Sequence, residues 1–304
     1  MILICDHHGN GLVKALRPLR EAGYDFTASK NLRDSRDRLQ EERFELLIID
    51  PLARAGTAEI EELVRLGNHA PRTPILLISD PEDPAAILHC SSILTGQVWD
   101  VIRADAPLEE FRLRLQHLLR QRTQIIELQD LRYRASHDDL TELLRPLYFQ
   151  ARLSEHYSAS ERHGLDLALL LIDLDRFGQV NKLFDHTTGD RVLSSVARVI
   201  QGSLRIEDVA GRIGGDEFAI LLPYTTAPEA ASTVRRLCQT IASIAGPQSG
   251  SDPEFPVSAS IGFETTTGKD LKSVEELRSH AEYALQRAKR AGGNQGVYFR
   301  SRTN

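Results

Sequence analysis

The segment Arg212-Ile213-Gly214-Gly215-Asp216-Glu217-Phe218-Ala219-Ile220-Leu221-Leu222 sets two glycines between strand-like apolar runs. This pattern predicts a β-hairpin, and Gly-Gly favours a primed turn, in which both central residues have positive φ. The carboxylates of Asp216 and Glu217 come directly after the turn. We expect them at the hairpin tip, pointing to opposite faces of the strand. Glycines there also let a phosphate approach the backbone, whereas the alternative is an ordinary solvated turn.

A second group of acids lies earlier in the chain, after the apolar run Ala168-Leu169-Leu170-Leu171-Ile172. A run of this length predicts a buried central strand. Asp173 and Asp175 end that strand and are expected to face the same side. Asp173 beside Asp216 would give Mg²⁺ two oxygen ligands, and nucleotide phosphates and water would complete its shell. The alternative, a cap on the following turn, applies to Asp175 more than to Asp173.

These segments resemble the GGDEF family, the diguanylate cyclases that join two GTP into cyclic di-GMP. The likeness covers residues 137 to 300 and opens at His137-Asp138-Asp139-Leu140-Thr141-Glu142-Leu143. It continues through the predicted strand Val257-Ser258-Ala259-Ser260-Ile261-Gly262 and closes at Gly292-Gly293-Asn294. The resemblance implies an α+β domain over 137–304, with an antiparallel-rich sheet flanked by helices, similar to a nucleotide polymerase palm.

The resemblance also implies the chemistry of the site. In such a palm a 3′-hydroxyl attacks an α-phosphate and pyrophosphate leaves, with catalysis by positioning and metal stabilisation of charge. Asp173, the Leu174 carbonyl and Asp216 would hold Mg²⁺ or Mn²⁺. Asp216 or Glu217 would be the catalytic group that helps to deprotonate the attacking hydroxyl.

Polar residues after Asp173 follow the order of the family's guanine-binding helices, with Asn181, His186, Gly189 and Asp190. A carboxylate at Asp190 suits guanine, which offers two adjacent donors, and repels adenine, so the resemblance implies GTP. Taken singly, Asn181 and Asp190 could instead be helix caps. The substrate-binding residues implied by the family are Phe177, Gly178, Asn181, His186, Asp190, Gly214, Gly215 and Lys289.

Three positions depart from the family pattern. Gly178 stands where most members have lysine, and Gly293 stands where most have arginine. A hydrogen bond to a charged group contributes about 1.5–3 kcal/mol, so two losses could cost roughly 3–6 kcal/mol. In Arg145-Pro146 the arginine of the opening motif is shifted by one position. Lys289 remains, and we expect a slow cyclase.

Arg205-Ile206-Glu207-Asp208 lies just before the hairpin, with five residues between Asp208 and Gly214. The family's product-inhibition site is an R-x-x-D motif at this distance, and Arg236 matches its second arginine. Arginine stacks on guanine and forks onto phosphate, while aspartate accepts from the guanine edge. The alternative is a pair on a helix surface at i and i+3.

Residues 1 to 121 alternate short apolar strands with helical patterns, which predicts a parallel α/β sheet. The expected strands are Ile2–Cys5, Phe26–Ala28, Leu46–Ile49, Ile75–Ile78 and Val98–Ile102. The order resembles a flavodoxin-like response-regulator receiver, with Asp50 as phosphoacceptor, Ser79 as switch hydroxyl, Asp6 as a metal acid and a histidine kinase as partner. His7 replaces a second acid and no lysine follows the fifth strand. A pseudo-receiver used for dimerisation is therefore the alternative to phosphotransfer.

Residues 107 to 136 contain no glycine, and proline occurs only at the first position. Apolar residues fall near heptad spacing at Leu108, Phe111, Leu115, Leu118 and Ile125, with Arg122 interrupting. This pattern predicts one long helix that links the two domains as the stalk of a homodimer. Each cyclase domain can hold one GTP, so two must meet. The alternative is an amphipathic helix packed on its own domain.

The length, net charge and cysteine content of the chain argue against other classes of protein. With 304 residues, two domains are the natural count, and a net charge of −6 argues against nonspecific nucleic-acid binding. Three scattered cysteines and the absence of an apolar run of membrane-spanning length predict a cytoplasmic protein. Two rival functions stay open: a catalytically silent receptor or adaptor for cyclic di-GMP, and a phosphorelay adaptor whose first domain matters most.

Overall fold

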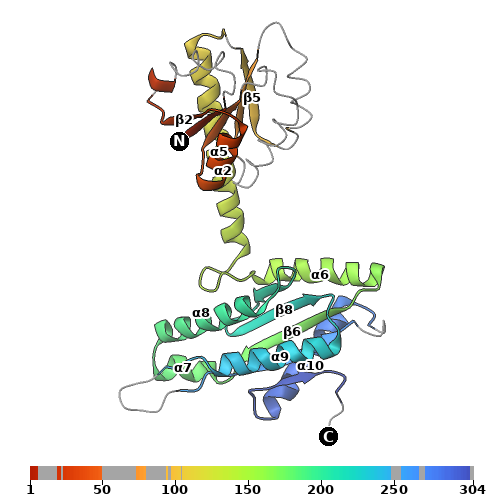
Figure 1. Ribbon diagram of the computed structural model, residues 1–304. Helices are drawn as coiled ribbons and strands as arrows, with labels where there is room; N and C mark the ends of the chain where they lie inside the picture. Colours follow the sequence, from red (N-terminus) through yellow and green to blue (C-terminus); the bar gives the residue numbers. More distant parts are fainter. Residues whose placement is uncertain are drawn as a thin grey trace. The chain divides into compact units, whose positions relative to one another are not determined.

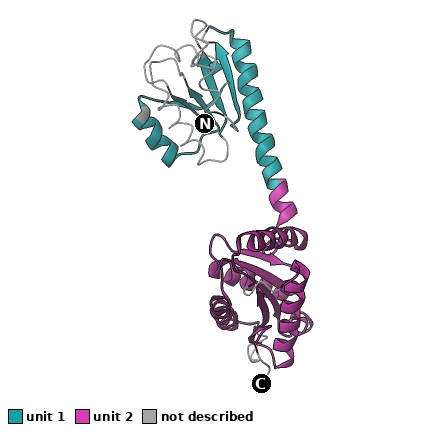
Figure 2. Ribbon diagram, turned by 90° about the vertical axis from the view of Figure 1, so that its right-hand side faces the viewer, with its two compact units in different colours: residues 1–130 teal, residues 131–304 magenta. Residues whose placement is uncertain are grey.

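In the computed structural model, the described residues are 1–5, 19–21, 23–49, 73–79, 94, 97–103, 105–247, 255–266 and 271–301. The chain divides into two compact units, residues 1–130 and 131–304 (Figure 2). Each unit has its own five-stranded sheet and its own hydrophobic core.

The sheet of the first unit is parallel, with the order β2-β1-β3-β4-β5. Its strands are β1 (Ile2–Cys5), β2 (Phe26–Ser29), β3 (Leu46–Ile49), β4 (Ile75–Ser79) and β5 (Trp99–Arg103). All five strands expected from the sequence are confirmed, with bounds that differ by one residue at most. This strand order is the one found in flavodoxin-like doubly wound sheets.

The three central strands, β1, β3 and β4, are buried on both faces, as their unbroken apolar runs predict. Alternate residues of β1 enter different core clusters, Ile2 and Ile4 on one face and Leu3 and Cys5 on the other. A further helix, α2 (Leu32–Glu41), begins at Asn31, whose side chain accepts from the Asp34 backbone NH. Such a cap satisfies one of the free NH groups of the first turn.

The residues predicted for a receiver pocket are Asp6, Asp50 and Ser79. Asp6 and Asp50 lie outside the described residues, and Ser79 ends β4 with a side chain that also lies outside them. Phosphotransfer and the receiver assignment therefore stay predictions.

One uninterrupted helix, α5 (Leu108–Ser136), covers the predicted linker. Phe111, Leu115 and Leu118 are buried in the core of the first unit, so the first part of α5 packs on its own unit. Leu128 and Leu131 are 48% and 62% exposed. Within the described ranges, no helix combines the length and the apolar character needed to cross a bilayer.

The sheet of the second unit has the order β10-β9-β6-β8-β7, with β6 at its centre (Figure 1). Its strands are β6 (Leu167–Leu174), β7 (Val209–Arg212), β8 (Glu217–Pro223), β9 (Ala259–Thr265) and β10 (Gly296–Tyr298). All pairs are antiparallel except β9 with β10. The antiparallel-rich sheet is thus confirmed, although β9 begins two residues later than the predicted strand at Val257.

Helices pack on both faces of this sheet. They are α6 (Pro146–His163), α7 (Phe177–Leu183), α8 (His186–Ser203), α9 (Ala227–Ala242) and α10 (Val274–Arg290). Leu170 and Ile172 of β6 share a cluster with residues of α7, α8 and α9, whereas Leu169 and Leu171 share one with residues of α6 and α10. This alternation explains why β6 is apolar at every position until Asp173.

Candidate functional site at the ends of β6 and β8

The residues predicted to hold a metal are neighbours at one end of the central sheet. Asp173 of β6 is paired in register with Glu217 of β8. The next residue, Leu174, donates its backbone NH to the Asp216 carbonyl at 3.3 Å. Asp173, Leu174 and Asp216 are therefore neighbours, brought together by the antiparallel pairing of β6 with β8.

Asp173 is a buried carboxyl among charges of both signs. Burial raises its pKa, and the negative charges of Asp216 and Glu217 raise it further, whereas Lys289 of α10 opposes the shift. The Lys289 ammonium lies 2.5 Å from Asp173 Oδ2. Because burial and like charges penalise ionised Asp173, a cation at this place would be stabilised electrostatically.

The hairpin differs from the predicted primed turn. Gly214 and Gly215 are not among the glycines with positive φ, and the loop from Ile213 to Asp216 is closed by NH groups of Ile213 and Gly214 that donate to the Glu217 carbonyl. A Cβ at Gly214 would come within 2.5 Å of a Glu217 carboxylate oxygen, which lies at the far end of an exposed side chain. A Cβ at Gly215 would meet nothing within 4 Å.

Sequence reasoning missed Arg212, which holds this loop. Its Nε and Nη2 donate to the Gly215 carbonyl at 3.1 and 2.8 Å, and its Nη1 donates to Asp138 Oδ1 at 3.0 Å. Burial disfavours ionised Asp138, but hydrogen bonds from Thr141 and Arg212 outweigh it and hold the pKa of Asp138 below its ordinary value. The carbonyl before Asp216 is thus fixed to the segment that follows α5.

Asp175 does not share the surroundings of Asp173, contrary to the expectation that both face one site. Its carboxylate accepts from Ser258 Oγ, Ser260 Oγ and the Asn294 backbone NH. It therefore joins β6 to β9 and to the turn after α10. It is not a cap on the turn that follows it, the alternative raised from the sequence.

The residues predicted to read a base lie within two helices that contact each other. Asn181 is inside α7 and Asp190 is inside α8, whose cap is Asp185, so neither residue is a helix cap. A Cβ at Gly189 would overlap the Asn181 side chain. Asn181 Oδ1 is buried and, among the described residues, has no hydrogen-bond partner. An unsatisfied buried acceptor suits a ligand that brings an NH donor.

The other predicted substrate residues have different surroundings. Phe177 is buried in the core, whereas Gly178 and His186 are exposed. Arg145, the shifted arginine, pairs with Asp139 at 3.1 Å and donates to the Arg134 carbonyl. Its side-chain contacts are therefore with the segment around the end of α5.

A cavity of about 470 Å³ brings together the three residues of the predicted inhibitory site, Arg205, Asp208 and Arg236. Residues 205–208 form a turn after α8, so the alternative of a helix-surface pair is wrong. Asp208 Oδ2 accepts from the Arg205 backbone NH at 2.8 Å, and burial raises the pKa of Asp208. The Arg205 side chain is exposed, and Arg236 donates to the Ser203 carbonyl.

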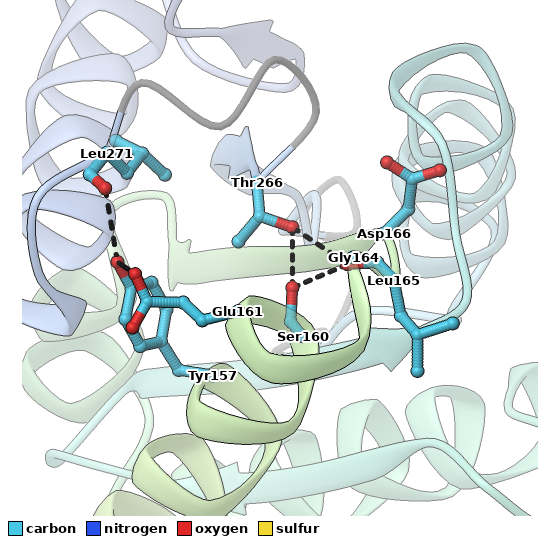
Figure 3. A pocket seen from close by; sticks show the side chains of 8 residues that line it. All are labelled: Tyr157, Ser160, Glu161, Gly164, Leu165, Asp166, Thr266 and Leu271. Carbon is cyan, nitrogen blue, oxygen red and sulfur yellow. Dashed lines mark hydrogen bonds between the residues drawn. The ribbon is translucent and has the colours of Figure 1, made fainter.

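A smaller cavity of about 240 Å³ lies beside the start of β6, at the other end of the strand from Asp173 (Figure 3). The Tyr157 hydroxyl donates to the Leu271 carbonyl. The Ser160 hydroxyl donates to the Leu165 carbonyl and shares a hydrogen bond with the Thr266 hydroxyl. These bonds tie α6 to the chain on both sides of the cavity, which does not include the predicted site residues.

Residues 135–295 match the family model described as diguanylate cyclase, GGDEF domain. The chain is 30% identical over 164 residues to the probable diguanylate cyclase DgcC of Escherichia coli K12. The match covers 54% of this chain and 43% of DgcC. It is 34% identical over 170 residues to the bifunctional diguanylate cyclase/cyclic di-GMP phosphodiesterase MucR of Pseudomonas aeruginosa. That match covers 56% of this chain and 24% of MucR. The matched part is therefore less than half of each of these relatives.

Solved structures give the same family. The coiled coil and GGDEF domain of DgcB from Caulobacter crescentus, in complex with c-di-GMP, is 26% identical with a TM-score of 0.57 and covers 63% of this chain and 100% of that one. Diguanylate cyclase SiaD of Pseudomonas aeruginosa, in complex with its activator SiaC, is 25% identical, with a TM-score of 0.51. The match covers 96% of this chain and 92% of the SiaD chain. Because the family model spans more than half of the chain, this protein belongs to the diguanylate cyclase GGDEF-domain family.

Proposed function

We propose that this chain is a diguanylate cyclase that condenses two GTP into cyclic di-GMP and two diphosphates. In each half of the reaction, the 3′-hydroxyl oxygen of one GTP bonds to the α-phosphorus of the other. The bond from that phosphorus to the bridging oxygen breaks, and diphosphate leaves. The hydroxyl proton passes to Asp216 or Glu217. The observation that carries the proposal is that Asp173 and Asp216 are neighbours where β6 pairs with β8, so that the charge of Asp216 acts on Asp173.

The residues at this end fit a divalent cation, Mg²⁺ or Mn²⁺. Asp173, the Leu174 carbonyl and Asp216 would hold it, and the raised pKa of Asp173 reflects burial and negative neighbours that a cation relieves. The described residues contain no group of three or more His, Cys, Asp and Glu suited to a metal. A nucleotide site needs only one or two carboxylates, because phosphates fill the shell. When bound, the ion stabilises charge on the transferring phosphoryl group.

Asn181 and Asp190 would select guanine. The unpaired Oδ1 of Asn181 can accept from an NH group of the base, and the exposed carboxylate of Asp190 can accept from N1-H and the exocyclic amine. Adenine lacks this pair of adjacent donors. ATP would therefore leave the Asp190 carboxylate facing an acceptor, which costs binding energy.

The reaction is expected to be slow, because two basic side chains that hold the triphosphate in most family members are glycine here. Lys289 is the basic residue that lies against Asp173. Incubation of the purified chain with GTP and Mg²⁺, followed by nucleotide chromatography, tests the proposal. We expect cyclic di-GMP to accumulate over hours. If GTP stays intact while cyclic di-GMP binds to the chain, the second candidate, a silent receptor, is correct instead.

Cyclic di-GMP is proposed to inhibit its own synthesis by binding in the cavity of Arg205, Asp208 and Arg236. Arg205→Ala is expected to raise the inhibition constant for added cyclic di-GMP by about 10-fold or more, because a bond to a charged group contributes about 1.5–3 kcal/mol. Steady-state yield should rise with it. Arg235→Ala is the matched control, since Arg235 is exposed on α9 and does not line the cavity. Unchanged inhibition in Arg205→Ala would refute the assignment.

The first unit is proposed to control the second as a receiver or pseudo-receiver, with α5 as the stalk of a homodimer. Apolar side chains on the second half of α5, among them Leu128 and Leu131, are about half exposed. Burying them against a second copy would be favourable. A histidine kinase is the partner that a phosphorylated receiver would require, and the cytoplasm is where GTP is available.

Sedimentation at micromolar concentration checks the stalk. We expect a dimer for the unmodified chain and for Gln124→Arg, which places a charge at an exposed polar position of α5. Ile125→Arg should give monomers and lower activity, because Ile125 follows the heptad spacing and the charge would be desolvated in the seam. A monomeric and fully active unmodified chain would exclude the stalk.

A further inference from the structure

We infer that Asp175 is a positioning residue that sets Lys289 against Asp173, and this inference rests on the proposed function. Its carboxylate accepts three hydrogen bonds, from Ser258 Oγ and Ser260 Oγ at 2.7 Å and from the Asn294 NH at 2.8 Å. The Asp175 NH also donates to the Ser258 carbonyl at 2.9 Å. Two segments that lie far from Asp175 in the sequence thus converge on its side chain.

The contact with Asn294 fixes the end of α10. The helix ends at Arg290, and the following turn folds back through Gly292, Gly293 and Asn294, with φ of +111°, +78° and +50°. The NH groups of Gly292 and Gly293 donate to the carbonyls of Lys289 and Ala288. Because the turn is bonded both to the last helical turn and to Asp175, the position of Lys289 depends on the Asp175 carboxylate.

Gly293 lets this turn lie on the carboxylate. A Cβ at Gly293 would come within 2.8 Å of the carboxylate carbon and of one oxygen of Asp175. Gly293 also has a positive φ, a backbone conformation that residues other than glycine rarely adopt. The glycine at this position therefore allows a close backbone contact with Asp175. Under the proposed function, Lys289 remains to bind the triphosphate.

The same contacts separate Asp175 from Asp173, although only Leu174 lies between them. A carboxylate offers about four lone-pair positions, and three at Asp175 are used by these donors. Asp173 instead faces Lys289, Asp216 and Glu217. Asp175 thus belongs to the frame around the site, comparable to groups that orient metal ligands in other enzymes.

A double-mutant cycle tests the inference, with two readouts: kcat/KM for GTP and the affinity for a non-hydrolysable GTP analogue with Mg²⁺. Loss of an orienting partner typically costs about 10–100-fold, so Asp175→Asn should weaken both by about 10-fold. Lys289→Met should weaken them at least as much. If Asp175 acts through Lys289, the double variant should match Lys289→Met alone. Multiplied effects would show a merely structural role and overturn the inference.

Two further measurements keep the result separate from the proposed function. Gly293→Ala should crowd the carboxylate and show the same dependence on Lys289, which covers the case in which Asp175→Asn does not fold. Affinity for cyclic di-GMP at the Arg205 cavity should stay unchanged in every variant. A nucleotide-free structure of Asp175→Asn or of Gly293→Ala should show Lys289 displaced from Asp173. An unchanged contact would overturn the inference, whether or not the unmodified chain turns over GTP.

Discussion

Asp216→Asn is expected to lower the rate of cyclic di-GMP formation by about 10³-fold. Asparagine keeps the size and the backbone of Asp216 but removes one of two carboxylates at the ends of β6 and β8. A bound cation supplies several kcal/mol of charge stabilisation in phosphoryl transfer, and about 4 kcal/mol corresponds to a factor of 10³. Initial rates from nucleotide chromatography, measured over a range of Mg²⁺ concentrations, give the comparison.

Matched variants make the loss specific. Asp139→Asn removes a carboxylate whose side chain is 80% exposed, and it should leave the rate within about twofold of the unmodified chain, as surface changes usually do. Glu217→Gln tests which acid receives the hydroxyl proton. We expect it to lower the rate strongly only if Glu217 is that acid. If Asp216→Asn retained normal activity while still binding cyclic di-GMP, the metal assignment would be wrong.

Gly178→Lys is expected to make the enzyme faster, raising kcat/KM for GTP by about 10- to 100-fold. Gly178 is exposed in the first turn of α7, and a Cβ there would meet nothing within 4 Å. A lysine therefore fits without displacing a neighbour. The expected gain equals one hydrogen bond to a charged group, about 1.5–3 kcal/mol.

Gly178→Met is the control for this gain, because it fills the same space without charge. Lysine and methionine both favour a helix over glycine, by up to about 1 kcal/mol, so a general effect of helix stability would appear in both variants. Equal activity of the lysine and methionine variants would show that charge at position 178 does not hold substrate. Position 293 is a poorer choice, since Gly293 has a φ of +78° and lies against Asp175.

The sequence predicted the strands well because their apolar patterns are local. The run before Asp173 became β6, and five short runs became the parallel sheet of the first unit. Family spacing also brought Arg205, Asp208 and Arg236 to one cavity. Such features need only periodicity or a motif, and both are visible in a single sequence.

What the sequence did not reveal depends on partners distant along the chain. Arg212 bonds to Asp138, 74 residues away, and no local pattern distinguishes it from any other strand residue. Asp175 looked like a companion of Asp173 until its bonds to Ser260 and Asn294, 85 and 119 residues away, were seen. The predicted primed turn was wrong, because neither glycine has a positive φ and the loop is closed by NH groups of Ile213 and Gly214 that donate to the Glu217 carbonyl.

The most direct measurement is a crystal structure of the chain with Mg²⁺ and a non-hydrolysable GTP analogue. We predict one ion bound by the carboxylates of Asp173 and Asp216 and by phosphate oxygens, with the guanine edge at Asn181 and Asp190. Nucleotide bound elsewhere, or no ion between the two carboxylates, would contradict the assignment of this site as the centre of cyclic di-GMP synthesis.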